Sequence, residues 1–313
     1  MVPPAEFRPP VLPSERLLAN GLARPQLRAQ LRRIANVRNA GSVISLWVLA
    51  AGMVAGAVAL NQWWAYAVAF VAMGPVQVRF AILMHEAAHR LLFSNKRWND
   101  WVGTWLVAYP AFVPISIYRR AHFAHHKEEF GPNEPDMAFY RGYPCEPRTL
   151  ARRLLRDAVG ISGWKNFRVL LGAVRSDAGR PIASSILGVQ ALMWAASGLA
   201  TGRWWIYPLL WWAPWMTQWR VLNRLRAIAE HGGMVAGDDR RVTTHQVRQS
   251  WGARLWLVPY RTGWHLAHHV DMGIPWRNLA RFHAELVAAG YVPEGLEAPS
   301  YRALWRSMAS APA

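Results

Sequence analysis

Three short clusters of histidine are the residues of this chain best able to do chemistry. They are His85-Glu86-Ala-Ala-His89, His122-Phe-Ala-His125-His126 and His265-Leu-Ala-His268-His269, and they hold eight of the 11 histidines. An α-helix turns about 100° per residue, so side chains at i, i+3 and i+4 share one face. Each cluster therefore predicts a one-sided array of imidazoles, the side chains best suited to bind iron, zinc or copper at neutral pH.

The number of histidines indicates two metal ions. Taken alone, His85-Glu86-x-x-His89 matches the HExxH motif of zinc peptidases, in which the glutamate is the general base. A catalytic zinc takes three protein ligands and keeps one open position, which leaves the other two clusters without a role. Two ions with four or five ligands each would use all of them. Nitrogen-rich sites with redox chemistry favour iron, while copper or two zinc ions stay open on residue types alone.

The composition indicates a membrane protein with one strongly basic face. The 313 residues are 53% hydrophobic and include 19 Trp, and the formal net charge is +18, from 36 Lys and Arg against 18 Asp and Glu. Most basic residues fall in segments 1–40, 119–180 and 220–313, the positive-inside asymmetry of a cytoplasmic face. This asymmetry explains the charge, so we expect no nucleic-acid partner. The single cysteine, Cys145, excludes an intrachain disulfide.

Charge-free runs predict the membrane-spanning helices, because about 20 apolar residues cross the hydrocarbon core of a bilayer. A further apolar run, 101–117, is interrupted by Pro110 and Pro114. If it crossed the membrane once, the first two histidine clusters would lie on opposite sides, so we expect it not to span. The expected transmembrane helices are, in two hairpins, about 41–60, 63–84, 181–202 and 204–222.

The predicted fold is an all-α integral membrane protein, with four transmembrane helices in two hairpins and a helical cytosolic cap that carries the histidine clusters. A basic N-terminal tail covers residues 1–40, the membrane domain residues 41–285, and a C-terminal tail residues 286–313. The N-terminal segment is arginine-rich and does not resemble a secretory signal. We expect a multi-pass protein of a bacterial-type inner membrane, with the clusters and both termini in the cytoplasm.

The order HxxxH, HxxHH, HxxHH, with two predicted transmembrane hairpins, resembles the membrane fatty acid desaturase superfamily. The resemblance runs over about residues 41–285 and includes Glu134-Pro-Asp136 after the second cluster and Ile274-Pro-Trp-Arg-Asn-Leu279 after the third. It implies a diiron centre that activates O2 to remove hydrogens from an unactivated C–H pair in a lipid-like chain. The family also has a further metal-binding histidine before the third cluster, which His231 matches here. The resemblance thus implies nine catalytic metal ligands: His85, His89, His122, His125, His126, His231, His265, His268 and His269.

The chain departs from the family pattern at a few positions. Stearoyl-type desaturases have an asparagine four residues before the extra histidine, which contacts metal through water; Ala227 stands there, and Asn223, one turn earlier, is the candidate substitute. Glu86 stands where the family more often has Asp, and His265 argues against the front-end subgroup, which has Gln there. Carboxylates behind the ligands would orient the imidazoles, and the nearest candidates by sequence are Glu86, Asp136, Glu230 and Asp271.

The resemblance implies an O2-dependent diiron desaturase that introduces a double bond into a fatty-acyl or other lipid-like alkyl chain, with the lipid-like substrate and the surrounding membrane lipids as its partners. Rebound of hydroxyl after the first hydrogen abstraction would give an alcohol, so a hydroxylase or ketolase acting, for example, on a carotenoid or sphingolipid stays open. A zinc metallopeptidase is a remote alternative, because it would leave two histidine clusters without a role. A metal transporter is also remote, because transport ligands belong near the middle of crossing helices. No cytochrome b5 segment is recognisable, and we expect a separate electron donor of ferredoxin, rubredoxin or cytochrome b5 type.

Overall fold

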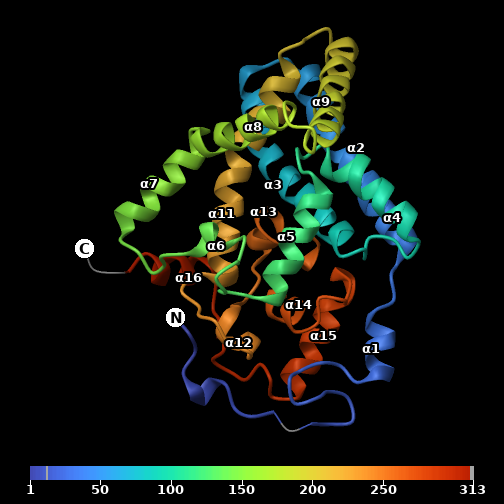
Figure 1. Ribbon diagram of the computed structural model, residues 1–313. Helices are drawn as coiled ribbons and strands as arrows, with labels where there is room; N and C mark the ends of the chain where they lie inside the picture. The colour runs from blue at the N-terminus through green and yellow to red at the C-terminus, as the bar shows by residue number, and fades with distance from the viewer. Residues whose placement is uncertain (12, 311–313) are drawn as a thin grey trace. The chain divides into compact units, whose positions relative to one another are not determined.

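The computed structural model describes residues 1–11 and 13–310 and divides into two compact units. The histidine-rich unit comprises Met1–Ala35, Arg119–Leu150 and Arg224–Ala313, and the apolar unit comprises Asn36–Tyr118 and Ala151–Asn223. The last residues of the predicted C-terminal tail, 311–313, lie outside the described residues. The elements (Figure 1) are η1 (Ala5–Phe7), α1 (Pro25–Leu31), α2 (Asn36–Leu60), α3 (Trp63–Ala88), α4 (Lys96–Val102), η2 (Gly103–Ala108), α5 (Ile115–Lys127), α6 (Met137–Tyr140), α7 (Pro147–Ala158), α8 (Ile161–Ala173), α9 (Arg180–Thr201), η3 (Pro208–Trp212), α10 (Ala213–Met216), α11 (Gln218–His231), α12 (Arg240–Thr243), β1 (Gln246–Val247), α13 (Trp251–Trp256), η4 (Pro259–Arg261), α14 (His265–Val270), α15 (Trp276–Ala288), β2 (Glu297–Ala298) and α16 (Tyr301–Met308).

The all-α membrane fold is confirmed. Within the described residues, three helical stretches are long and apolar enough to cross a bilayer: Pro25–Leu60, Trp63–Ala88 and Arg180–Thr201. They contain or closely match the first three expected spans. The fourth expected span, 204–222, is instead divided among η3, α10 and the start of α11. Pro208 and Pro214 lie in this stretch, and proline removes a backbone donor and crowds the preceding turn. The number of four spans therefore stays a prediction.

Two tight turns reverse the chain within the apolar unit, one between α2 and α3 and one after α9. Between α2 and α3 the chain reverses at Asn61, whose φ of 47° is a left-handed conformation that asparagine tolerates. After α9 it reverses at Gly202, with φ 67°. The indole Nε1 of Trp194 then donates to the carbonyl of Trp204 at 2.7 Å, which fastens the returning chain to α9. Each reversal thus depends on residues that are close together in the sequence.

The apolar run 101–117 is not one continuous helix. It passes through the π-helix η2 into a turn, and α5 begins at Ile115. Side chains from elsewhere in the apolar unit bond the carbonyls of this turn: Gln190 Nε2 donates to Tyr109 at 2.6 Å, Trp211 Nε1 to Pro110 at 3.0 Å and Trp215 Nε1 to Ala111 at 3.0 Å. Irregular backbone at membrane depth is stable only where protein or water satisfies it in this way. That the run does not cross the membrane stays a prediction.

In the histidine-rich unit, the motif after the third cluster builds the support for that cluster. Trp276, at the start of α15, is 2% exposed, and α15 packs against both α14 and α1. Asn278 Nδ2 donates to the carbonyls of Leu31 and Arg33 at 2.7 and 3.1 Å, which fixes the end of α1 to α15. The short strands β1 and β2 pair in parallel, with Gln246 opposite Glu297.

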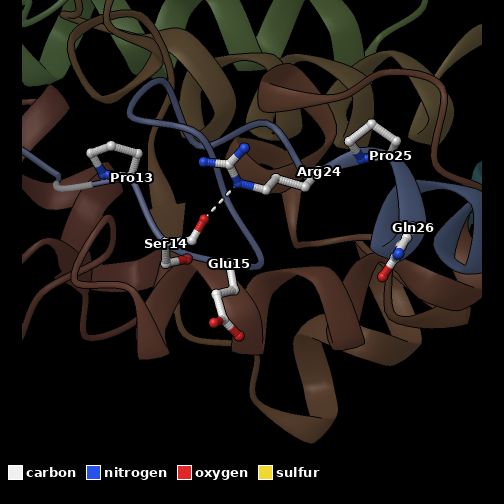
Figure 2. Close-up of a pocket in the computed structure, with 6 residues that line it drawn as sticks. All are labelled: Pro13, Ser14, Glu15, Arg24, Pro25 and Gln26. Atoms are coloured by element: carbon white, nitrogen blue, oxygen red, sulfur yellow. Dashed lines mark hydrogen bonds between the residues drawn. The ribbon is translucent and has the colours of Figure 1, made fainter.

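The basic N-terminal segment is folded against itself rather than extended. Leu17 and Ala23 form a β-bridge and are both buried. Arg24 Nε donates to the carbonyl oxygen of Ser14 at 2.6 Å, which closes a loop around a shallow polar hollow (Figure 2).

Candidate metal centre

Three helices of the histidine-rich unit carry seven of the predicted ligands. The second cluster lies on α5, the third on α14, and His231 is the last residue of α11. Just before α14 the chain bends sharply, because Tyr260 and Arg261 both adopt positive φ values near 60°. Apart from His265, whose side chain is 14% exposed, these imidazoles are buried: His122, His125, His126, His231, His268 and His269.

The first imidazole group consists of His122, His126 and His268. His122 Nε2 lies 3.1 Å from His126 Nε2, and His268 Nε2 lies 3.1 Å from the same atom. The spacing of four residues between His122 and His126 puts both rings on one face of α5, as the sequence predicts. His268 reaches them from a position 142 residues further along the chain.

The second imidazole group consists of His125, His231, His265 and His269. His265 Nε2 lies 3.0 Å from the Nε2 atoms of both His231 and His269. The ring of His125 lies 4.8 Å from that of His231 and 5.1 Å from that of His269, measured between centroids. Ligand atoms of His125, His231 and His269 all lie within 4.8 Å of one another. His231, inferred only from the family resemblance, thus lies with the clustered histidines.

Acceptors behind the second group fix the orientation of its rings. His125 Nδ1 lies 3.0 Å from both carboxylate oxygens of Glu134, and His269 Nδ1 lies 2.5 Å from Glu129 Oε1. His231 Nδ1 lies 2.9 Å from the carbonyl oxygen of Thr243. An acceptor at Nδ1 holds the proton there and leaves the lone pair on Nε2, the arrangement that metal-binding histidines use.

The geometry of both groups fits metal ions. Two nitrogens bound at right angles to a metal, each about 2.1 Å from it, lie roughly 3.0 Å apart, which matches the Nε2 separations of 3.0–3.1 Å. In the second group, His231 and His269 each have an acceptor at Nδ1, and the Nε2 atom of each lies 3.0 Å from His265 Nε2. The donor set is all imidazole, which suits iron, copper or zinc.

Electrostatics keep most of the second group ready to bind a cation. Burial, and then repulsion from the neighbouring histidines, lowers the pKa of His231, His265 and His269 well below the ordinary value, so these rings are neutral at pH 7. Burial also acts to lower the pKa of His125, but the hydrogen bond and charge of Glu134 outweigh it and raise that pKa. Glu134 is therefore the strongest electrostatic partner in the group.

A second layer of contacts holds Glu129 in place. Arg240 Nη1 donates to Glu129 Oε1 at 2.5 Å, and Arg240 Nη2 donates to the carbonyl of His126 at 3.1 Å. The side chain of Glu129 is 1% exposed, whereas that of Arg240 is 28% exposed. One arginine thus links α12 to the orienting carboxylate and to the helix that carries the second cluster.

Two of the carboxylates predicted from sequence, Asp271 and Glu230, pair with arginines. Asp271 pairs with Arg28, with Oδ2 2.6 Å from Nε, and so ties α1 to the end of α14. Glu230 pairs with Arg226 at 2.9 Å and lies 3.9 Å from His265 Nδ1, beyond hydrogen-bond distance. Asp136 lies with His125 and Glu134 in a group of possible ligand atoms.

The first cluster and Asn223 belong to the apolar unit. His85 lies in the last turn of α3 and His89 caps that helix, with ring centroids 4.6 Å apart. Glu86 is 2% exposed, and its Oε1 lies 3.7 Å from His85 Nδ1. Asn223 lies on α11, eight residues before His231. The i, i+4 pair of imidazoles predicted at the end of α3 is therefore present on one face.

Sequence reasoning missed Glu129 and Glu134 as the orienting carboxylates. Glu134 carried a signal, because it opens the Glu134-Pro-Asp136 motif already associated with the family. Glu129 lies one turn beyond His125 and His126 but contacts His269, which is 140 residues away. Only the folded chain identifies that pair.

Comparison with known proteins gives independent evidence of the family to which the chain is related. Residues 61–298 match the fatty acid desaturase family. The chain is 29% identical to dihydrorhizobitoxine desaturase of Bradyrhizobium elkanii over 68% of this chain and 65% of that protein. It is 27% identical to zeaxanthin 4-ketolase of Chlamydomonas reinhardtii over 46% and 31%, and 24% identical to sn-1 oleoyl-lipid 12-desaturase of Arthrospira platensis over 71% and 68%. The chain thus spans less than two thirds of the length of the first two relatives.

Proposed function

Because this chain belongs to the fatty acid desaturase family, we propose that it is a diiron, O2-dependent membrane oxidoreductase that desaturates a lipid-like alkyl chain. Two relatives whose names describe desaturases, one of them acting on an oleoyl lipid, support this reaction. The proposal includes an external electron donor of ferredoxin, rubredoxin or cytochrome b5 type.

The observation that carries the proposal is the convergence of imidazole Nε2 atoms in two adjoining groups on α5, α11 and α14. Separations of 3.0–3.1 Å within each group fit ligands that share a metal ion, and the presence of two groups supports two ions. We assign His122, His126 and His268 to one iron, and His125, His231, His265 and His269 to the other. His85 and His89 join the ligand set on the three-cluster pattern of the family. Asn223 remains a candidate for a water-mediated contact.

In this account the protein holds and tunes the metal ligands. Glu129, Glu134 and the carbonyl of Thr243 keep the proton on Nδ1, so that Nε2 faces the metal. Bound iron would supply the reduction of O2 and the oxidising power needed to break an unactivated C–H bond. The overall change balances as –CH2–CH2– plus O2, two electrons and two protons giving –CH=CH– and two waters. The external donor supplies the electrons.

Oxygen insertion is the second candidate, because one relative is named as a zeaxanthin 4-ketolase. Hydroxylation uses the same inputs: a C–H bond, O2, two electrons and two protons give an alcohol and one water. The same metal ligands serve both outcomes. The position of the substrate carbon relative to the metals would decide between them.

Mass spectrometry of lipids from cells that express the chain tests the reaction. A desaturase gives products lighter by two hydrogens, a hydroxylase gives products heavier by one oxygen, and label from ¹⁸O2 enters only the oxygenated products. The His268→Ala variant is the matched control and should give neither product. A zinc peptidase built on His85, Glu86 and His89 would keep its activity in that variant, and a metal transporter would form no oxidised lipid in any cell.

A further inference from the structure

The apolar unit contains a cavity of about 290 Å³ that the histidine site does not involve. This volume is at the small end of the range for ligand pockets. Its walls come from the turn at 111–114, from α8, from the start of α9 and from residues 215–220. Most of the lining is apolar, including Phe112, Leu170, Ile182, Trp215 and Trp219. The cavity therefore suits a narrow hydrocarbon segment.

Arg220 is the one charged side chain among the described residues that line this cavity. Its Nε atom is buried and has no hydrogen-bond partner, and no ion pair joins its guanidinium to an acid within the described chain. The guanidinium carbon lies 4.1 Å from the centroid of the Trp215 ring. That ring is itself held by its bond to the Ala111 carbonyl and by stacking on Phe112, with centroids 4.2 Å apart. The charge of Asp157, which is 1% exposed, also acts favourably on this guanidinium. The Nε–H group still lacks an acceptor, and a buried donor of this kind favours an anionic oxygen beside it.

The surface around the cavity has the composition of a membrane–water boundary. Helices α7 and α8 and the turn between them expose large apolar side chains: Leu155, Val159, Ile161, Trp164 and Val169. Interspersed with these are the cations Arg152, Arg153, Arg156, Lys165 and Arg168. Amphipathic helices of this kind lie among lipid headgroups and attract anionic lipids. Val169, which is 69% exposed, also lines the cavity, so the cavity adjoins this lipid-facing surface.

We propose that this cavity binds an anionic phospholipid, with the phosphate on Arg220 and the first part of an acyl chain against Phe112, Leu170 and Ile182. Asn166, which lines the same cavity, supplies a further polar group for the headgroup. The small volume admits the phosphate and the first carbons of one acyl chain, and the remainder of the lipid stays in the bilayer. This site is separate from the proposed oxidation chemistry and does not depend on it.

Lipid titration of the full-length protein in detergent, followed by native mass spectrometry, tests this site. The probes are dioleoyl-phosphatidylglycerol and dioleoyl-phosphatidylcholine, which share their acyl chains and differ in headgroup charge. We expect at least tenfold tighter binding of one phosphatidylglycerol than of phosphatidylcholine. Both lipids can place a phosphate on Arg220, but the choline cation cancels the net negative charge of the headgroup and is repelled by the guanidinium and the surrounding basic residues. In Arg220→Met this preference should disappear. In the matched control Arg175→Met, which alters an exposed arginine just beyond α8, it should remain within twofold.

A second variant separates the cavity from a general basic surface. Ala173→Phe fills the cavity from α8 and leaves Arg220 in place, so it should lower the affinity for both lipids. Phosphatidylglycerol binding within twofold of wild type in either Arg220→Met or Ala173→Phe would overturn the proposal. Displacement of the lipid by millimolar inorganic phosphate would also overturn it, because the site would then recognise the anion alone.

Discussion

Both carboxylate oxygens of Glu134 lie 3.0 Å from Nδ1 of His125, and both side chains are buried. A carboxylate so placed fixes the ring and strengthens its Nε2 as a ligand, and loss of such a partner typically weakens metal binding 10–100-fold. We expect this loss in Glu134→Ala, measured as the metal retained against increasing chelator. Glu230→Ala is the control, because Glu230 lies 3.9 Å from His265 Nδ1 and pairs with Arg226. Wild-type affinity in Glu134→Ala would contradict the assignment.

Arg240→Met should destabilise the histidine-rich unit. The substitution leaves the buried carboxylate of Glu129 without its cation, which costs roughly 2–3 kcal/mol at a partly exposed pair. The apparent melting temperature in detergent should therefore fall by several degrees. A double variant, Glu129→Gln with Arg240→Met, removes both charges and should recover part of the loss. An equal loss in the double variant would show that the charge of Glu129 is not the cause.

Asp271→Ala should loosen the N-terminal segment rather than the metal ligands. The carboxylate of Asp271 holds Arg28 of α1 at 2.6 Å, across 243 residues of sequence. Limited proteolysis within residues 1–35 should therefore become faster, both in Asp271→Ala and in Arg28→Met. The double variant should be cleaved at about the same rate as either single variant, because both substitutions remove the same ion pair. Metal content should stay at the wild-type level. Loss of metal in Asp271→Ala would instead support the role predicted from sequence, that of orienting an imidazole.

His245 should make the protein sensitive to acid. Burial lowers its pKa to about 4, while Nε2 donates to the carbonyl of Gly232 at 2.7 Å. The unfolded chain binds this proton near pH 6.5. The contribution to stability is therefore complete above about pH 6.5 and is lost as the pH falls toward 4.

Melting temperatures between pH 7 and pH 5 check this pH dependence. The metal-free forms of wild type and His245→Gln should be compared, so that protonation of metal ligands is the same in both. Glutamine can donate to the same carbonyl without titrating, and its curve should be flatter. Parallel curves for the two proteins would rule out His245 as a source of the acid sensitivity.

Local periodicity was enough to predict the helices that carry the histidine clusters and the three long apolar helices. The spacing of His122, His125 and His126 depends only on the helical repeat, and long charge-free runs depend only on composition. The breaks in these runs depend on tertiary contacts. The turn within 101–117 is stabilised by Gln190, Trp211 and Trp215, which lie about a hundred residues away.

The pairing of Glu129 with His269 could not be predicted from sequence for a related reason. Sequence proximity favoured Glu86, Glu230 and Asp271, which adjoin or closely follow a predicted ligand. In the folded chain Glu230 and Asp271 pair with arginines, and His269 receives its carboxylate from Glu129, on another segment. The carboxylate of Asp271 pairs with Arg28 on a distant segment and that of Glu230 with Arg226 on its own helix. Adjacency in sequence therefore says little about which ring a carboxylate contacts.

The metal content of the gently purified full-length protein tests the central claim most directly, with iron, zinc and copper counted together. We expect about two irons per chain in the wild-type protein. In His268→Ala, both the iron content and the lipid-oxidising activity should fall clearly. A single zinc per chain, with full activity retained in His268→Ala, would contradict it.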